Sequence, residues 1–306
     1  MANPDVSAIT GYVNQTKLSL IGKVFNGADS LKHFNMQAGV KGATQLTLLD
    51  TTVELADGSN CGWNPKGADT FSKRVIDPAL MTVQKAWCPD VLFKTWMNEQ
   101  LNYAAKGTEM TDAQLAEVIV GQQVTETSKA LENVIWNGKK ASGALIDGLA
   151  TIIKAESSAV KYEYEAGATV SSIVDAVIEK IPEDAYSMGD VVLYMGKDMY
   201  RNYLQDLRAN GNLVLNLGYD NLAAPESVIA PLTDVKVIGV RGLNNTGEVY
   251  ASFANNFVYG TDLVDGPEQV SFKYVDYDEQ YHLTIKFVAG VQVAFPSLIV
   301  YAKEQA

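Results

Sequence analysis

The sequence predicts an α+β protein. Three observations lead to this prediction: a Thr- and Leu-rich stretch at 44–55 with partial period-two alternation, an amphipathic helix at 169–181, and alternating strands from Val270 onward. The chain has 306 residues, of which 47% are hydrophobic and 20% are charged. This composition is sufficient to bury one substantial core or two linked ones.

Composition also argues against several classes of protein. The formal net charge of -12 and the pI near 4.7 disfavour a protein that wraps nucleic acid, because phosphate binding needs concentrated Lys and Arg. No apolar run approaches the roughly 20 residues that cross a bilayer, and the start of the chain lacks the pattern of a signal peptide. The chain is therefore expected in a cytoplasm when it is made. Cys61 and Cys88 have no metal-ligand spacing and are expected to be reduced, structural thiols.

The first part of the chain is predicted to be an arm followed by a hairpin. Residues 1–43 carry little pattern apart from a short helix around Leu18 to Val24, and they are interpreted as an arm rather than as a core element. Residues 44–87 are predicted to form a long hairpin, which is marginal in water on its own and should lie on another surface. Its strands are expected at 44–55, 70–76 and 80–87, with turn chemistry at 57–67 and with Met81, Val83 and Trp87 on one face.

Two helices are predicted next. The first runs from about 90 to 105, with Leu92 and Trp96 on one face. The second covers 111–137 after a Thr-x-x-Gln capping box that starts at Thr111, and it would be roughly 37 Å long. Its middle, at 121–129, is too polar for a fully buried helix. It is therefore expected to lie as a strut across a domain surface.

The second half of the chain alternates helices with strands and then ends in strands. The alternation from about 168 to 265 predicts a compact α+β domain, and the closing strands predict one half-covered sheet. Helices are expected at 169–181, where Pro182 forbids continuation, and at 198–209; strands are expected at 191–195, 235–240, 249–259, 270–274, 281–287, 291–295 and 298–301.

No residue of the sequence is assigned a catalytic, cofactor-binding or metal-binding role. The histidines are His33 and His282, which is too few for a triad or a two-His metal site, and each is interpreted as structural or solvated. The glycines from Gly138 to Gly148 lack the strand-before, helix-after context of a phosphate cradle and indicate a loop. The acidic stretch 274–280 lacks the pattern of a calcium loop and indicates a solvated strand connection.

Aromatic residues leave one alternative open. Tyr250, Phe253, Phe257 and Tyr259 have the residue type that stacks on sugar rings or bases, but their spacing in expected strands favours core packing. A soluble acidic chain without a convincing site indicates a structural protein.

The order of these elements resembles the tailed-bacteriophage major capsid protein family, with the Hong Kong phage-type shell fold that encapsulins share. The hairpin at 44–87 is similar to that family's extended loop, and the helix at 111–137 to its long spine helix. The passage Leu131 to Gly138, followed by Asp147-Gly148-Leu149, is similar to its usual turn after the spine. The closest match, from Thr169 to Gly211, is similar to its axial domain.

The resemblance implies an architecture and a function. The function is that of a major capsid protein that self-assembles into hexamers and pentamers of an icosahedral shell around the double-stranded DNA of a tailed phage, without sequence-specific DNA contacts, an enzymatic activity or a cofactor. Its implied partners are copies of itself, a portal, a separate scaffolding protein and decoration proteins. Because the arm starts almost at Met1, the resemblance implies that the scaffolding protein is either a separate chain or absent. The implied location is the virion, after assembly in the host cytoplasm. The implied parts are an N-terminal arm at 1–43, an extended hairpin loop at 44–87, a peripheral domain at 88–167 with its spine helix at 111–137, an axial domain at 168–265 and return strands of the peripheral domain at 266–306.

Three other functions compete with this interpretation. An encapsulin-type nanocompartment shell shares the fold and would hold enzyme cargo instead of DNA. A carbohydrate-binding or adhesion module is suggested by the aromatic strands. An enzyme is hardest to support, because no cluster of acid, base and nucleophile is visible.

Overall fold

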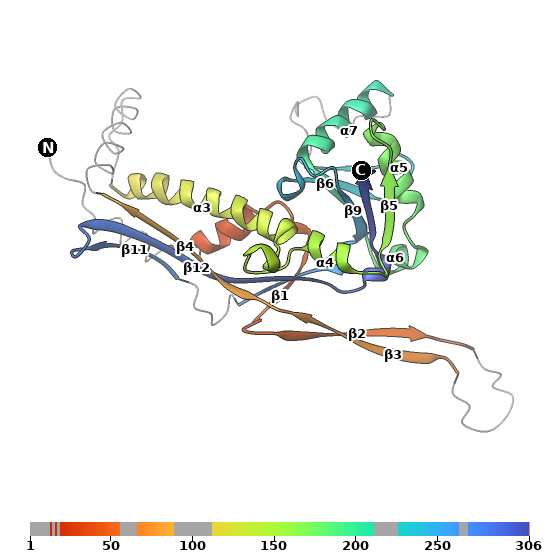
Figure 1. The fold of residues 1–306 in the computed structure, drawn as a ribbon, viewed down its shortest axis with the longest axis horizontal. Coiled ribbons are helices and arrows are strands. Elements are labelled where there is room, and N and C mark those ends of the chain that lie inside the picture. Colours follow the sequence, from red (N-terminus) through yellow and green to blue (C-terminus); the bar gives the residue numbers. More distant parts are fainter. Residues whose placement is uncertain are drawn as a thin grey trace.

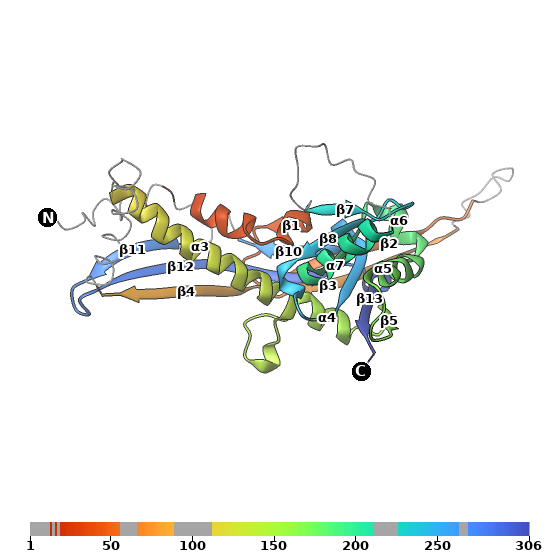
Figure 2. The same ribbon diagram turned by 90° about the horizontal axis from the view of Figure 1, so that it is seen from above.

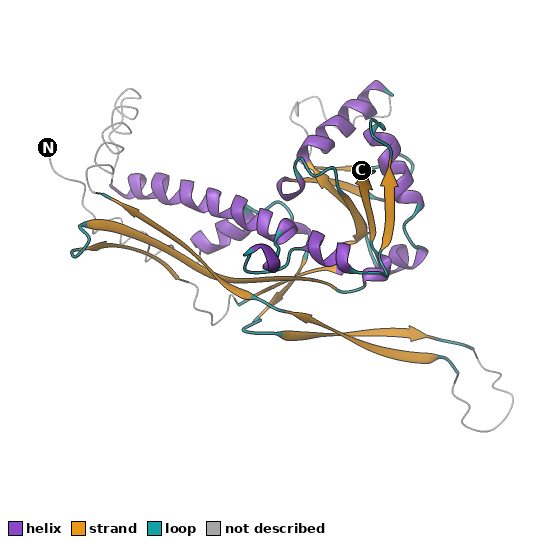
Figure 3. Ribbon diagram, in the orientation of Figure 1, coloured by secondary structure: helices purple, strands orange, loops and turns teal. Residues whose placement is uncertain are grey.

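The computed structural model describes residues 13, 16, 19–55, 66–88, 112–210, 226–262 and 269–305. Two sheets of different shape carry most of this chain, and a long two-stranded hairpin projects from the region between them (Figures 1 and 3). The predicted α+β class is confirmed. The predicted helix at 90–105, with Leu92 and Trp96, lies outside the described residues.

The first sheet, named the peripheral sheet after the domain expected for most of its strands, is long and narrow. Its central strand pairs antiparallel with two partners over one half and with a third partner over the other half. The apolar face predicted for 80–87 is confirmed, because Met81 lies opposite Phe287 and Val83 lies opposite Ile285. The strands are β1 (Asn35–Ala38), β4 (Ala79–Trp87), β10 (Phe257–Thr261), β11 (Gln269–Val275) and the central β12 (Gln280–Val293).

The predicted long helix is confirmed as α3 (Asp112–Asn137), which lies along this sheet (Figures 1 and 2). Its polar middle is buried on one side only: Val124, Thr127 and Ser128 face the core, whereas Gln122 and Glu126 are exposed. The two buried hydroxyls donate hydrogen bonds to carbonyl oxygens four residues earlier, so their burial leaves no polar group unsatisfied. Thr111 lies outside the described residues, so its capping box stays a prediction.

The second sheet, with the helices packed on it, is named the axial part after the domain expected at 168–265, and its strand order is β5-β13-β9-β6-β8-β7. Helices α5 (Val170–Glu179) and α7 (Lys197–Ala209) pack on one of its faces, as their predicted apolar stripes require. Of two shorter helices, α6 (Glu183–Met188) contacts β9 of this sheet, whereas α4 (Leu149–Ala155) packs against α3 and β12. The strands are β5 (Val160–Tyr164), β6 (Val191–Gly196), β7 (Ser227–Ile229), β8 (Lys236–Val240), β9 (Val249–Phe253) and β13 (Val300–Glu304).

The fully buried strand β6 is shared by two hydrophobic cores. Val191, Leu193 and Met195 pack in the core beneath α5 and α7, whereas Val192 and Tyr194 pack in the larger core with α3 and the peripheral sheet. Because successive side chains point to opposite faces of a strand, a continuous apolar run is required where both faces are covered. The prediction of a buried strand at 191–195 is confirmed, and both of its faces are covered.

The interpretation of residues 1–43 as an arm outside the core is wrong for the described part. Residues 19–26 are helical, and Leu20, Ile21, Val24 and Phe25 lie in the larger core, where the Phe25 ring meets Tyr259 edge-on at 5.7 Å between centroids. These four residues form a stripe barely two turns long, which is too short for its periodicity to be decisive. Strand β1 then joins the peripheral sheet in parallel with β10.

The hairpin is shorter than predicted. It consists of β2 (Thr44–Thr52) and β3 (Ala68–Ile76), whereas the segment at 79–87 leaves it and becomes β4 of the peripheral sheet. Asp77 and Pro78 separate β3 from β4, and proline has no N–H to continue a ladder. The apolar face of β4 is covered by joining β12, which the two-stranded hairpin could not do.

Sheet membership of the later strands also differs from the prediction. The strand expected at 249–259 is two strands, β9 and β10, which the 3-10 turn Ala254–Asn256 directs into different sheets. The closing strands likewise form two sheets, because β13 pairs with β5 and β9 of the axial sheet. The ranges expected to be peripheral, 88–167 and 266–306, therefore each contribute one strand to the axial sheet.

Candidate assembly surfaces

The β2–β3 hairpin presents an apolar stripe to solvent. Leu49 lies opposite Phe71 in the ladder, and Val75 follows on the same face of β3. Their exposed fractions are 51%, 67% and 44%, although large apolar side chains are usually covered. Beyond its root the hairpin makes its ladder contacts within itself and extends away from both sheets (Figure 1). An apolar stripe on a projecting ribbon is suited to contact with another molecule.

The root of the hairpin is fixed to the body by packing and by polar contacts. Arg74 pairs with Glu156 at the end of α4 and contacts Oε1 of Gln292 on β12 at 3.3 Å. Gln292 in turn donates a hydrogen bond of 2.7 Å to the carbonyl oxygen of Val75. Ile76 is fully buried in a small core of its own. The ribbon is thus held at its base and projects from a defined direction.

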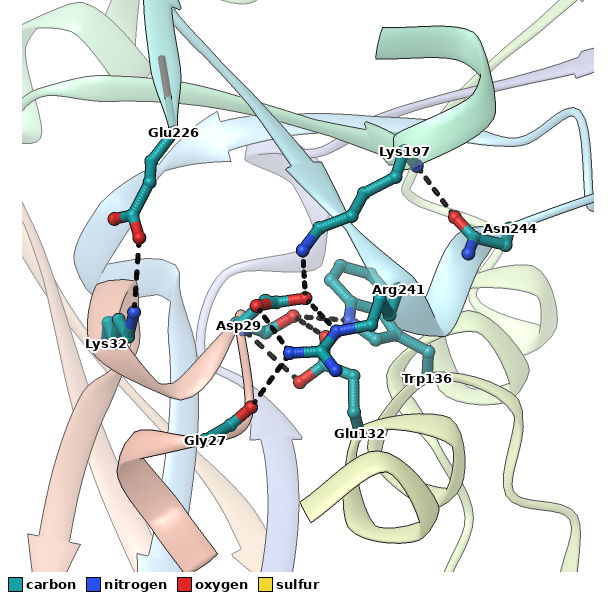
Figure 4. A network of polar contacts seen from close by, with 10 residues as sticks. Gly27, Asp29, Lys32, Glu132, Trp136, Lys197, Glu226, Arg241 and Asn244 are labelled. Atoms are coloured by element: carbon teal, nitrogen blue, oxygen red, sulfur yellow. Dashed lines mark hydrogen bonds and ion pairs between the residues drawn. The ribbon is translucent and has the colours of Figure 1, made fainter. Parts of the chain in front are cut away.

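A polar network joins the N-terminal segment to the axial part (Figure 4). The carboxylate of Asp29 forms ion pairs with Nε of Arg241 and with Nζ of Lys197, each at 2.8 Å. Arg241 also donates a hydrogen bond of 3.3 Å to the carbonyl oxygen of Gly27. Burial alone would raise the pKa of Asp29, but the hydrogen bonds from Arg241 and Lys197 outweigh it and lower that pKa. Asp29 is therefore charged at neutral pH and ties three separate segments together.

A buried acid lies beside this network, where the N-terminal segment crosses α3. Glu132 is almost fully buried; it accepts hydrogen bonds from the backbone N–H of Ser30, at 3.2 Å, and from the Ser30 hydroxyl. The indole N–H of Trp136 donates to the same hydroxyl at 2.6 Å. Burial raises the pKa of Glu132, and the nearby charge of Asp29 acts in the same direction. This junction holds the N-terminal segment against the helix by specific contacts.

The turn after α3 is a close crossing of two backbones. Gly148 donates its N–H to the carbonyl oxygen of Gly138 at 2.9 Å. A Cβ atom on Gly148 would stand 2.5 Å from the carbonyl oxygen of Trp136, and one on Gly138 would stand 2.6 Å from that of Ile146. The prediction that these glycines lie in a loop is confirmed. Gly138 and Gly148 are needed because a side chain there would collide with the neighbouring backbone, and not because a phosphate binds.

The residues considered for chemistry do not come together. His33 is half-buried, and His282 lies 3.5 Å from Asp278 on the β11–β12 connection, so the two histidines occupy different parts of the molecule. The described ranges contain no group of His, Cys, Asp and Glu suited to a metal ion. Cys88 is a free, exposed thiol, and Cys61 lies outside the described residues. Within those same ranges, no helix has the length and apolar character to span a bilayer.

The aromatic residues of β9 and β10 pack in the core. Tyr250, Phe253, Phe257 and Tyr259 are all at least 96% buried, which confirms packing and leaves no ring face for a sugar. The acidic stretch at 274–280 includes the turn between β11 and β12, as predicted, and its Tyr277 is 95% exposed.

A pocket that the sequence does not predict lies between the N-terminal segment and α7. Its volume is about 270 Å³. Its walls come from segments about 170 residues apart in the chain, and no local pattern joins them. The feature of the sequence that could have indicated the pocket is a pair of cations, Lys197 and Arg201, which lie four residues apart on one face of a helix. It is lined by Asp29, Lys32, His33, Lys197, Tyr200, Arg201, Glu226, Ile238 and Gly239.

This architecture is similar to that of solved structures, although comparisons of the sequence find no match. No protein-family model matches the chain, and no curated protein matches it. Solved structures do match: a chain of the satellite phage P4 procapsid has a TM-score of 0.60 at 11% identity, and the match covers 94% of this chain and 99% of that one. The chain has a capsid shell fold. A structure from Gordonia phage Cozz matches with a TM-score of 0.59 at 11% identity, over 91% of this chain and 87% of that one.

The shell fold extends beyond phages. A virus-like particle from Pyrococcus furiosus matches with a TM-score of 0.53 at 11% identity, over 95% of this chain and 98% of that one. The predicted likeness to phage capsid proteins and encapsulin-type shells is thus confirmed as a likeness of fold.

Proposed function

We propose that this protein is the major capsid protein of a tailed bacteriophage, and that it assembles into hexamers and pentamers of an icosahedral shell around double-stranded DNA. The single observation that supports this most is the β2–β3 hairpin, which carries exposed Leu49 and Phe71 on a shell fold. A neighbouring copy is the natural cover for this stripe, since each copy would cover the next. Many modest contacts of this kind make a closed shell cooperative.

The charge of the chain suits a container for DNA. A net charge of -12 repels phosphate and leaves a packaged genome free to move. The proposed role is structural, without enzymatic activity or a cofactor. The proposed partners are further copies of the chain, a portal, a separate scaffolding protein and decoration proteins. The proposed location is the virion, after assembly in the host cytoplasm.

Expression of the full chain tests this proposal. The protein would be produced alone and together with a candidate scaffolding protein, and then analysed by sedimentation and negative-stain microscopy. Closed polyhedral shells, or rings of five and six copies, are the expected products. A small monomer in both preparations, at all concentrations tested, would contradict a capsid role.

One second function has a specific observation in its favour. The match to the virus-like particle from Pyrococcus furiosus supports a nanocompartment shell. The contents of purified particles distinguish the two functions: nuclease-resistant double-stranded DNA of uniform length supports the phage capsid, whereas a stoichiometric co-purifying enzyme supports the nanocompartment. A carbohydrate-binding module is not proposed, because the aromatic rings that suggested it are buried.

A further inference from the structure

The pocket beside α7 is a basic concavity on an acidic molecule. Lys197 pairs with Asp29 at 2.8 Å, and Lys32 pairs with Glu226 at 3.6 Å (Figure 4). Asp29 also binds Arg241, so its single charge is matched by two cations. Arg201 lines the same pocket, is exposed, and makes no ion pair within the described part of the chain. The pocket therefore carries an excess of positive charge and is suited to a carboxylate from outside.

The opposite side of the axial part carries the complementary charge. Helix α6 begins with Glu183 and Asp184, which are exposed and make no ion pair among the residues that the structure describes. Tyr186 and Met188 of the same helix are each 42% exposed, so α6 presents two acids beside two apolar side chains. The pocket offers matching groups, because its lining includes the cations Arg201 and Lys32 and the apolar surfaces of Tyr200 and Ile238.

These two surfaces cannot meet within one molecule. Helix α6 follows α5 directly in the chain and contacts β9, at the end of the axial part that faces away from α3, whereas the start of α7 lies toward α3 (Figures 1 and 2). A contact between two different patches of identical copies is heterologous, and repetition of such a contact closes a ring when the rotation allows it. Each copy in that ring would use both patches.

We infer that the pocket of one copy receives α6 of a second copy, with Glu183 and Asp184 bound by Arg201 and Lys32. This inference rests on the proposed function and specifies the contact that closes a ring of five or six subunits. Like charges placed across an interface are strongly unfavourable, so the contact also selects one direction around the ring. The occupant is a second copy because every copy carries both the carboxylates of α6 and the cations of the pocket.

Charge reversal tests the contact. R201E alone, and E183K together with D184K, are each expected to raise the subunit concentration needed for half-assembly at least about tenfold, because each change places like charges in contact. The quadruple variant K32E/R201E/E183K/D184K should recover most of this loss, because both cations of the pocket are then reversed together with both carboxylates of α6, and the ion pairs form again with reversed polarity. R208E is the matched control, since Arg208 is an exposed arginine of α7 outside the pocket, and it should assemble like the wild type.

A second measurement uses the wild-type chain and does not depend on the folding of a variant. Shells assembled from a mixture of isotopically light and heavy subunits would be treated with a carbodiimide, which joins a lysine to a carboxylate in direct contact. Light-to-heavy links from Lys32 or Lys197 to Glu183 or Asp184 are expected. Their absence, in shells where other lysine–carboxylate links between copies form, would overturn the inference.

The outcomes separate this inference from the proposed function. If the wild type forms neither rings nor shells, the capsid role fails and the ring contact fails with it. If the wild type assembles but R201E does so equally well, or the quadruple variant is as defective as E183K/D184K while circular dichroism shows it folded, only the contact is overturned. Links from these lysines to acids elsewhere on the second copy would likewise overturn it.

Discussion

Gly148 stands where a side chain would collide with the backbone of the preceding helix. G148A is expected to destabilise the unassembled subunit by about 1–3 kcal/mol, because the new Cβ would lie 2.5 Å from the carbonyl oxygen of Trp136. Urea denaturation of the monomer measures this loss. G121A is the matched control: Gly121 lies within α3 with nothing within 4 Å of its Cβ position, so alanine there should stabilise the subunit by about 0.5–1 kcal/mol. Equal effects of the two changes would contradict this account of Gly148.

Glu132 makes the stability of the junction depend on pH. Its pKa is raised above the usual 4.5 by burial, so its contribution to stability is fully present below about that pH and is lost as the pH rises through the raised value. E132Q cannot ionise, and its stability relative to the wild type should therefore rise between pH 4.5 and neutral pH. Asp29, whose pKa is lowered from 3.8, stays charged throughout this window. A difference between the two proteins that stays constant with pH would refute this role of Glu132.

At the residue scale, the sequence predicts packing better than it predicts contacts. The alternation in β9 and β10 correctly indicates that their aromatic residues pack in a core. The hydrogen bond between Ser30 and Glu132 joins residues 102 positions apart, and nothing local in either segment indicates it. The basic pocket is unpredictable for the same reason, because its lining comes from four separate segments.

A charged residue on the exposed apolar face of the hairpin should impair assembly. F71D is expected to change the stability of the free subunit by less than about 0.5 kcal/mol, because the Phe71 side chain is 67% exposed there. Shell assembly should fail or need at least about tenfold more protein, since a charge would enter an apolar interface. Light scattering of concentrated subunits follows assembly, and thermal melting checks the fold.

S72D is the matched control for that change. Ser72 is the next residue on β3, it is also exposed, and its side chain points to the other face of the ribbon. Assembly of S72D should stay near that of the wild type. If S72D and F71D were equally defective, charge on the ribbon rather than the apolar stripe would be the cause.

At the element scale, the long amphipathic segments are predictable and their partners are not. The helices at 111–137, 169–181 and 198–209 are confirmed, with small differences at their ends, because each carries its own periodic stripe. Strands β4 and β13 are also found, but in other sheets than expected. Period-two alternation indicates that one face of a strand is covered and does not indicate which strand lies beside it.

Across the whole molecule, stability should be distributed unevenly. Strand β6 lies in both cores and its backbone should exchange amide hydrogens slowly, whereas the hairpin beyond Arg74 lies outside both and should exchange rapidly in the free subunit. Hydrogen exchange of free and assembled protein measures this difference. Assembly should slow exchange in the hairpin and leave β6 unchanged. A hairpin that is already slow to exchange in the free subunit would contradict its role as a surface completed by a neighbour.

The three polar anchors at the base of the hairpin lie on separate parts of the chain. Arg74 reaches the end of α4 and β12, and Asp77 pairs with Lys140 in the loop after α3. A pull on the ribbon is therefore shared among α4, β12 and the loop after α3, so the base of the hairpin cannot pivot about any one of them.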